Sequence, residues 1–356
     1  MNNRCLVAVA SVLMIACAIV PCLNGLDAES NQQYYDADDA SYEMAMFVDD
    51  SDILYALDSS MTEKTLIMED DTLTVAIDEQ PVLLASTVNN GTPIIIEGDA
   101  TSLTSLGMTI AVDPNSDVSA VYRDPVNGTV YCYGVESDSD NATDLAMVWI
   151  ESVKNNTSST DSDVVLTYTK TLDCSDKKAQ INGTATYTEL GNSLGKTYYS
   201  VRYHAESVCL DSKWSAADIR VVCDVDANNA FQGLVSYGPS NTDGEISQSV
   251  GVSISAGGPE LSASWSYTIS ETTIENNCNT GENYFDINHD TNEKNRKGTI
   301  VVEPGMIVYV QDGSHYTAID EYSVNYYKPY YEHLWPWDPD YEYEEYTLNV
   351  VAVINP

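Results

Sequence analysis

Oxygen-bearing side chains alternate near residue 290 with the spacing of a calcium-binding loop. Asp286, Asn288, Asp290 and Asn292 offer carboxylate and amide oxygens at every second position, which is how a tight loop surrounds a hard cation. The EF-hand pattern fails, because Thr291 stands where that loop needs glycine. Asp and Asn are also common turn residues, so a plain polar turn competes with a metal site. The run predicts at most a structural calcium ion, and no other cofactor is expected.

Signatures of catalysis fail in their local context. Residues 191–195 read G-x-S-x-G, the pattern of a serine nucleophile elbow, but the residues that follow indicate a strand, whereas the elbow must lead into a helix. The four histidines lie far apart and form no paired metal-binding motif. The sequence therefore favours a protein that is not an enzyme. The alternative is a secreted hydrolase that cleaves glycans with an Asp/Glu pair, which 55 acidic residues neither support nor exclude.

Tyrosine and tryptophan are concentrated in residues 326–346, a stretch interrupted by three prolines. Proline disfavours a helix and a central strand, so we expect a long loop. The rings either cover the local core or form a contact surface, where flat aromatic faces beside carboxylates suit sugar rings or a protein partner. The predicted ligand contacts are Tyr330, Tyr331, Trp335, Trp337, Asp338 and Asp340.

The most regular pattern lies in residues 249–256 and 261–270, where apolar residues alternate with Ser, Gly and Thr. An ordinary sandwich hairpin, with its apolar row in the core, explains this alternation. A membrane-inserting hairpin, with lipid on one face and a small polar lumen on the other, explains it too. The segments are at the lower edge of the about 9 to 11 residues that span a bilayer. Trp265 also lies mid-strand rather than at a membrane interface, so pore formation ranks third among the functional hypotheses.

The net charge of the chain limits the classes of partner that it can bind. The chain of 356 residues has 15 Lys and Arg against 55 Asp and Glu, a net charge of −40. Such a surface repels phosphate backbones, which argues against nucleic acid as a partner. We interpret the acidity as a solvated coat whose self-repulsion salt or divalent cations would relieve. Hydrophobic residues make up 43% of the chain, so a core can form.

The N-terminus has the layout of a signal peptide, because Arg4 precedes an apolar run that ends at Pro21. We expect residues 1–25 to be removed and the rest to act outside the cell, secreted or at its surface. An uncleaved segment would be the membrane anchor. Five cysteines follow the signal, an odd number that leaves at least one thiol unpaired. The expected local disulfide joins Cys209 and Cys223; the other three are Cys132, Cys174 and Cys278.

Periodicity and turn signals divide the remaining chain into three parts. Residues 26–51 are expected to form a flexible acidic leader. Residues 52–158 contain strand patterns, a hairpin over 118–135 and a helix after Asn141, with Leu145, Val148, Trp149 and Val153 at helical spacing. Residues 159–356 contain ten short β patterns. They cover 164–169, 184–190, 197–204, 219–223, 248–256, 261–270, 299–302, 306–310, 321–326 and 346–353.

The predicted fold class is α+β: a small mixed α/β N-terminal domain, 52–158, followed by a larger, mostly antiparallel β-sandwich domain, 159–356. The leading functional hypothesis is a non-catalytic secreted or cell-surface protein that binds a glycan or a protein partner. The hydrolase and the β-hairpin pore former are the second and third hypotheses.

Overall fold

The computed structural model describes residues 45–48, 54–57, 72–74, 85, 88–98, 100–136, 142–156, 163–173, 179–211, 213–225, 231–239, 247–254, 261–268, 272–291, 298–330 and 340–355. In chain order its elements are β1 (Ala45–Val48), β2 (Leu54–Leu57), β3 (Thr72–Thr74), β4 (Ile94–Glu97), the 3-10 helix η1 (Thr101–Leu106), β5 (Ile110–Val112), β6 (Val118–Arg123), β7 (Val130–Glu136), α3 (Ala142–Asn156), β8 (Val164–Asp173), β9 (Ala179–Ser193), β10 (Lys196–Cys209), β11 (Ser215–Val225), β12 (Gln232–Gly238), β13 (Ser247–Ile254), β14 (Leu261–Thr268), β15 (Thr272–Asn276), β16 (Tyr284–Thr291), β17 (Thr299–Val302), β18 (Gly305–Gln311), β19 (Tyr316–Tyr330) and β20 (Asp340–Ile354).

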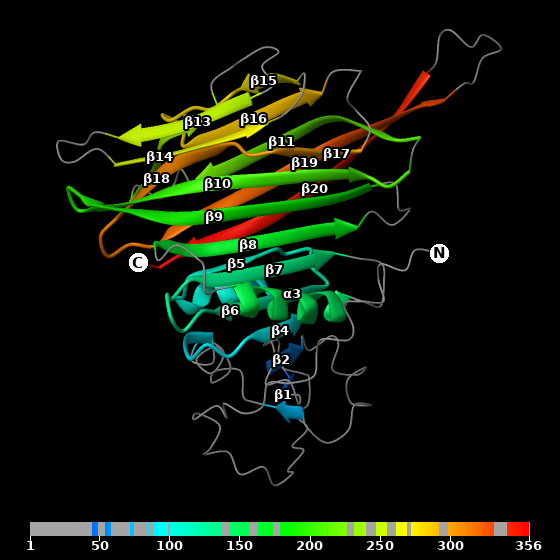
Figure 1. Ribbon diagram of the computed structural model, residues 1–356. Helices are drawn as coiled ribbons and strands as arrows, with labels where there is room; N and C mark the ends of the chain where they lie inside the picture. Colours follow the sequence, from blue (N-terminus) through cyan, green and yellow to red (C-terminus); the bar gives the residue numbers. More distant parts are fainter. Residues whose placement is uncertain are drawn as a thin grey trace.

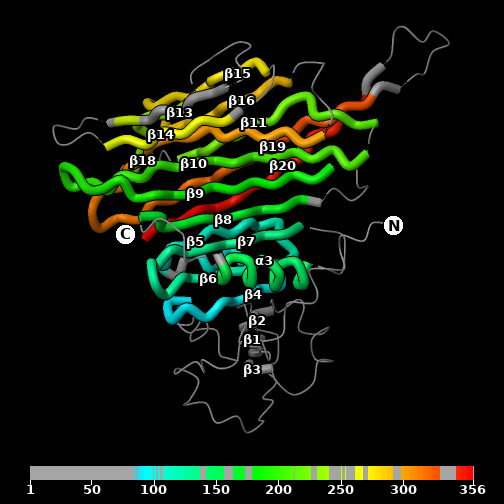
Figure 2. The backbone as a smooth tube through the Cα atoms, viewed as in Figure 1, coloured from blue at the N-terminus to red at the C-terminus, as the bar shows by residue number. Residues whose placement is uncertain are grey.

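Long, mostly antiparallel strands form the body of the molecule (Figure 1). A twelve-stranded sheet follows the order β12-β18-β10-β9-β8-β7-β6-β4-β2-β1-β3, and β17 also pairs with β10. A six-stranded sheet follows the order β15-β16-β11-β19-β20-β5. The last strand, β20, comes back to contact β8 of the large sheet (Figure 2). Strands β13 and β14 form a separate two-stranded sheet.

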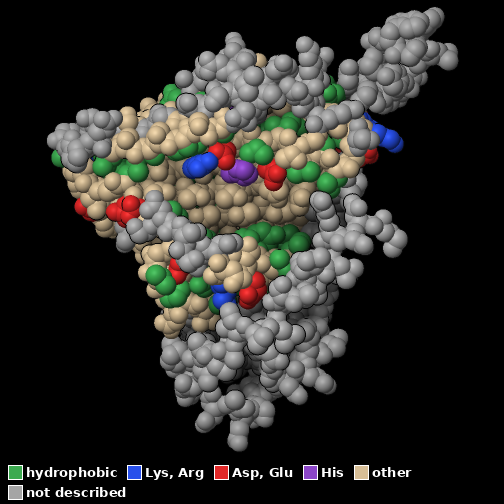
Figure 3. All heavy atoms as spheres, viewed as in Figure 1, with side chains coloured by type: hydrophobic (Ala, Val, Ile, Leu, Met, Phe, Trp, Pro, Cys, Tyr) green, Lys and Arg blue, Asp and Glu red, His purple; other side chains and the backbone are tan. Residues whose placement is uncertain are grey.

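Strict alternation gives the long strands one core face and one solvent face. Along β9, Ala179, Ile181, Ala185 and Tyr187 are fully buried, while the residues between them are half-buried. Their partners on the solvent face are mostly Thr, Asn and Gln, which favour a pleated surface in contact with water. Charged side chains are sparse on the face of the large sheet seen in Figure 3. Few of the acidic side chains of the chain therefore lie on the described part of this face.

A buried carboxylate joins the two large sheets. Asp320 of β19 is fully buried and accepts hydrogen bonds from three tyrosines of the large sheet. Tyr187 and Tyr203 donate at 2.6 Å, and Tyr168 donates at 3.0 Å. Burial raises the pKa of the Asp320 carboxyl above its ordinary value, although the hydrogen bonds from the tyrosines act to lower it. A satisfied polar network of this kind fixes how one sheet lies on the other.

The predicted N-terminal α/β domain is wrong, because the chain is mostly β and its sheets run through the expected boundary. Strand β7 pairs in parallel with β8, from Val130↔Leu166 to Glu136↔Leu172, so the two sides of residue 158 share one sheet. Helix α3 is the connection between these parallel strands, which need a crossover of this kind. The larger β region is confirmed.

Helix α3 forms as expected, and Trp149 packs against the sheet, but two of the four apolar residues at helical spacing do not. Ala142, Ala146 and Ile150 are buried against the sheet, whereas Leu145 and Val148 are 42% and 50% exposed. The small alanines on the buried face allow the helix to approach β4, β6 and β7 closely. The helix covers one face of these strands in Figure 1.

The ten predicted strands of the C-terminal half are all present, and most are longer than expected. Strands β12, β15 and β16 were not predicted. The loop that we expected over 326–346 is shorter, because β19 continues to Tyr330 and β20 begins at Asp340. Pro329 is tolerated because β11 reaches only as far as Tyr327, so β19 has a single partner strand there.

The described cysteines are thiols rather than disulfides. Cys132, Cys209, Cys223 and Cys278 are all free, so the expected pair Cys209–Cys223 is not formed. Burial raises the pKa of Cys132 and of Cys278 to about 12. Cys174 lies outside the described residues, as do the signal segment, most of the acidic leader and Asn141.

Candidate functional site

The hairpin of β13 and β14 has two chemically different faces. Its register pairs Val250 with Trp265 and Ser253 with Ser262. Val250 and Tyr267 are buried, and Leu261, Ala263 and Trp265 pack partly buried against the core. The described serines are exposed: Ser253, Ser262, Ser264 and Ser266. The apolar row faces the body and the serine row faces water, so this much of the expected alternation is confirmed.

Formal charge is almost absent from the hairpin sequence. Residues 246–259 and 261–270 contain no Asp, Glu, Lys or Arg, and Glu260 lies between the two runs. Charged residues make up 20% of the whole chain, which makes the contrast pronounced. A solvent-exposed hairpin of a soluble protein has no need to avoid charge on its outer face. An uncharged alternating strand pair fits an ordinary sandwich hairpin and also a hairpin that enters a bilayer.

Side chains, rather than a backbone ladder, hold the hairpin on the body. Strand β13 contacts β12 and β18, and β14 contacts β9, but neither strand pairs with any of them. The Trp265 indole Nε1 donates to the carbonyl oxygen of Glu303 at 2.8 Å. The indole also lies directly on Gly305, where a Cβ atom would overlap it. The backbone of Glu303 and Gly305 therefore forms a flat contact surface for Trp265, which we call the Trp265 seat.

Charged groups surround this seat. Arg202 lies with its guanidinium 5.7 Å from the Trp265 ring centre, a cation–π distance. Arg202 also bonds to the Glu303 carboxylate at 2.5 Å, and His204 Nδ1 lies 2.9 Å from the same group. Burial acts to raise the pKa of Glu303, but the hydrogen bonds from His204 and Arg202 outweigh it and hold that pKa below its ordinary value. The carboxylate stays ionised and keeps Arg202 over the indole.

A second attachment covers a buried histidine. The Tyr267 hydroxyl lies 2.6 Å from Nε2 of His289, which belongs to β16 and is fully buried. Burial lowers the pKa of His289 to about 3, so the imidazole is neutral at physiological pH. Protonation of this ring requires that water reach it. Tyr267 is one of the side chains that exclude that water.

The residues predicted to bind calcium lie on a strand. Asp286, Asn288 and Asp290 occupy alternate positions of β16, and Asn292 lies outside the described residues. The Asp286 carboxylate is taken by a two-point contact with Arg220, at 2.8 Å to Nε and 2.7 Å to the terminal nitrogen. Within the described residues no group of three or more His, Cys, Asp or Glu is placed to hold a metal ion. Calcium binding stays a prediction.

The structure describes only two of the six residues that were predicted to contact a ligand. Tyr330 and Asp340 are opposite each other at the ends of β19 and β20. Tyr331, Trp335, Trp337 and Asp338 lie outside the described residues. Binding of a glycan or protein at this tip therefore also stays a prediction.

The attachment residues were missed by the sequence analysis. Arg202 and Glu303 are about a hundred positions apart in the chain, and nothing in either segment indicates the pairing. The alternating Trp265 and Tyr267 were visible, but their partners on the body were not. The described part of the chain contains no helix with the length and hydropathy that crossing a membrane requires.

Comparisons with known proteins give weak structural neighbours. No protein-family model matches the chain, and no curated protein matches it in sequence. Among solved structures, Clostridium perfringens delta-toxin aligns over 53% of this chain and 93% of its own, with 11% identity and a TM-score of 0.35. A structure titled pore forming protein aligns over 52% of this chain and 91% of its own, with 13% identity and a TM-score of 0.33. Similarity this low establishes neither family nor function.

Proposed function

We propose that this protein acts outside the cell as a pore former whose β13–β14 hairpin leaves the body and enters a membrane. The observation that carries the proposal is the hairpin itself: uncharged, apolar on one face, serine-rich on the other, and joined to the body through side chains. In a bilayer the apolar row faces lipid and the serine row faces water in the lumen. The same side chains serve both states without a change of register.

The length of the uncharged runs suits a spanning strand. A strand needs about 9 to 11 residues to cross the hydrocarbon core, and residues 246–259 and 261–270 each supply that length without a charge. Glu260 would lie at the turn, beyond the hydrocarbon. A single hairpin leaves the backbone groups of both edges unpaired, which lipid does not tolerate. Several copies must therefore join, and a closed ring of at least about eight strands needs about four copies.

Departure of the hairpin leaves the body intact. No strand of the twelve- or six-stranded sheet depends on β13 or β14 for its backbone hydrogen bonds. Among the described residues the losses are the cation–π contact of Arg202, the two side-chain hydrogen bonds, and the apolar contacts of Val250, Leu261, Ala263, Trp265 and Tyr267. Burial of these apolar contacts in lipid replaces the burial lost from the core.

Release of a trapped dye from vesicles tests the proposal. Because the net charge of −40 repels anionic surfaces, the vesicles are phosphatidylcholine, with and without cholesterol, in about 0.15 M salt. Ala263→Lys and Ser264→Lys form a matched pair, since they place the same charge on neighbouring residues of opposite faces. A lysine on the lipid face costs about 2–4 kcal/mol per copy near the bilayer centre, whereas a lysine in the lumen stays hydrated.

We expect wild type and Ser264→Lys to release dye and Ala263→Lys to lose at least about a factor of ten in rate. Ser264→Lys should also shift the ion selectivity of the pore toward anions. Thermal melts of the soluble proteins check that both variants fold. No release by wild type from either membrane, or equal release by the two lysine variants, contradicts the proposal.

A further inference from the structure

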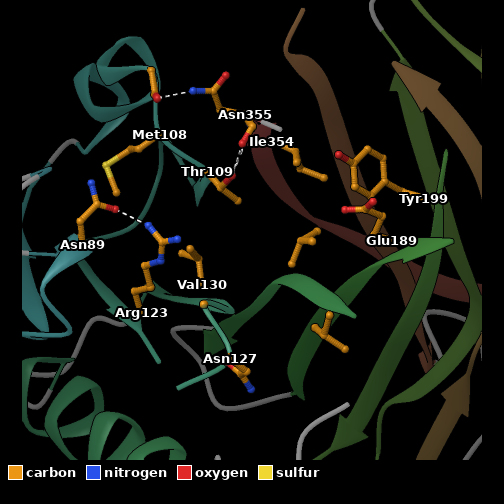
Figure 4. Close-up of a pocket in the computed structure, with 14 residues that line it drawn as sticks. Asn89, Met108, Thr109, Arg123, Asn127, Val130, Glu189, Tyr199, Ile354 and Asn355 are labelled. Atoms are coloured by element: carbon orange, nitrogen blue, oxygen red, sulfur yellow. Dashed lines mark hydrogen bonds between the residues drawn. The ribbon is translucent and has the colours of Figure 1, made fainter. Parts of the chain in front are cut away.

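A cavity of about 400 Å³ lies among the ends of several strands. Its lining comes from the turn after β6, the start of β8, residues of β9 and β10, and the end of β20. Figure 4 shows the residues that line it, with Arg123 and Asn89 on one wall and Glu189 and Tyr199 on the other. The volume is in the range of small-molecule sites. Neither the hairpin nor its seat contributes to the cavity.

Two β-bulges shape this cavity. The β8–β9 register shifts between Val164 and Leu166, and the β9–β10 register shifts between Tyr198 and Tyr199. Val164, Val165, Glu189 and Tyr199 all line the cavity. Bulges in neighbouring strands re-aim side chains and are frequent beside functional sites. Here they open the core at the point where Glu189 and Tyr199 face each other across the strand pair.

Glu189 occupies a position that alternation would give to an apolar residue. It continues the inward row of β9 after the buried Ala185 and Tyr187, and its cross-strand partner Tyr199 is only 1% exposed. Within the described residues the structure gives neither the Glu189 carboxylate nor the Tyr199 hydroxyl a hydrogen-bond or ion-pair partner. Burial, and then the charge of Glu189, raise the pKa of Tyr199, so its hydroxyl remains a donor. Polar groups placed inward and left unbonded need a ligand or water.

The opposite wall supplies donors. Arg123 donates to the Asn89 side-chain oxygen, a contact that orients the guanidinium beside the cavity. The walls thus carry one positive and one negative charge. A phosphate would meet Glu189, and a simple cation would meet Arg123. A neutral molecule with several hydroxyls satisfies both walls, because each hydroxyl donates to a carboxylate and accepts from a guanidinium.

We propose that this cavity binds a sugar of one or two rings, with Glu189 accepting from ring hydroxyls and Tyr199 and Arg123 donating to them. The sugar is either a free saccharide or the terminal ring of a membrane glycolipid. The site is independent of the hairpin, so its failure leaves pore formation untouched, and the reverse holds too.

Titration calorimetry on the full-length protein tests the site with a panel of hexoses, N-acetylhexosamines and their disaccharides. Phosphocholine and inorganic phosphate serve as charged comparison ligands. Glu189→Gln and Tyr199→Phe each remove one hydrogen-bonding function and little volume. Tyr198→Phe is the matched control, because Tyr198 lies on the other face of β10, where it packs beside Tyr309. Sedimentation with vesicles that carry the preferred sugar as a glycolipid distinguishes the two sources.

We expect at least one sugar to bind with a Kd of about 1 mM or tighter. Glu189→Gln and Tyr199→Phe should each weaken that binding about 10-fold or more, and Tyr198→Phe should leave it unchanged. Tighter binding to the glycolipid vesicles than to the free sugar identifies the lipid as the source, and equal binding identifies the free saccharide. The proposal is overturned if no sugar binds, if only phosphocholine or phosphate binds, or if Glu189→Gln and Tyr199→Phe bind like wild type.

Discussion

Two hairpins of this molecule are built from similar alternating strands and are held in opposite ways. The β9–β10 hairpin lies inside the large sheet, with β8 on one side and β18 on the other, so its backbone groups are paired on both edges. Among the described strands, none pairs with an outer edge of the β13–β14 hairpin. Alternation alone thus makes both hairpins, and pairing at the edges decides which of them is fixed. The first cannot leave without unfolding the sheet, whereas the second can.

The hydrogen bonds of the inward side chains also fix the β9–β10 hairpin more firmly than the β13–β14 hairpin. Tyr187 and Tyr203 of β9 and β10 bond to the buried Asp320, which has no access to water. Trp265 and Tyr267 of β14 bond to a carbonyl and to an imidazole. A buried carboxyl without its hydrogen-bond partners is more costly than a lost contact to a neutral group. The body should therefore open at a much higher free energy than the hairpin.

Loss of the buried carboxylate should have the largest effect. Asp320→Ala removes the carboxyl to which three buried tyrosine hydroxyls donate, so we expect the free energy of unfolding to fall by about 3–5 kcal/mol. Urea unfolding followed by circular dichroism measures this. Glu321→Ala, one residue away on the opposite face of β19, should change it by about 0.5 kcal/mol or less. Equal effects of the two substitutions would remove the distinction between body and hairpin.

Loss of the Trp265 indole should have the next largest effect on stability, and this effect should be confined to the hairpin. Trp265→Ala removes a large half-buried ring and its hydrogen bond to Glu303, so the free energy of hairpin opening should fall by about 2 kcal/mol. Amide hydrogen exchange should then quicken along β13 and β14 and stay unchanged along β9. Ser264→Ala, on the solvent face of the same strand, is the control. Faster exchange throughout the body would show that the hairpin does not open independently.

Acid should act on the hairpin through His289. Its pKa in the folded protein, about 3, lies below the ordinary 6.5, so the folded state takes up the proton later than a state in which the ring is exposed. The contribution to stability is complete above about pH 6.5 and is lost progressively as the pH falls toward 3. Between pH 7 and 5 the loss is about 2 kcal/mol.

Denaturation curves at pH 7 and pH 5 check this dependence, with vesicle release measured in parallel. His289→Gln should flatten the pH dependence, while His204→Gln, which changes a half-exposed ring, should leave most of it. If the wild type and His289→Gln lose the same stability on acidification, Tyr267 and His289 do not couple the hairpin to pH.

Salt should have the smallest effect, and only on the body. The hairpin runs have no formal charge, whereas the chain carries −40. Screening should therefore raise the melting temperature by a few degrees between low salt and about 0.5 M NaCl, without slowing exchange along β14. Calcium with and without a chelator, at constant ionic strength, tests the expected metal separately. A melting temperature unaffected by both salt and calcium would contradict the acidic-coat interpretation.

Local sequence predicted what depends on local pattern. The strands of the C-terminal half, the hairpin over 118–135, helix α3 and the two-faced character of β13–β14 all follow from periodicity. The pairing of β7 with β8 across residue 158 did not follow, because it joins segments that are distant in the sequence. The run Asp286, Asn288 and Asp290 looked like a loop because its oxygens alternate, yet a strand places side chains with the same period of two.

The candidate sites show the same limit. Trp265 and Tyr267 were visible as members of an alternating row, but Glu303 and His289 become their partners only in the folded chain. Glu189 drew no attention among 55 acidic residues. Its inward position depends on the register of β9 against β10, which no single segment encodes.

The absence of a crosslink among the four described cysteines bears on how the protein can be produced. Their thiols are held by packing, and burial raises the pKa of each, which slows both oxidation and alkylation. Expression in a reducing bacterial cytoplasm should therefore yield the same fold as export to an oxidising compartment. A single cysteine introduced on the exposed serine row could then carry a fluorescent label with little competition from these native thiols.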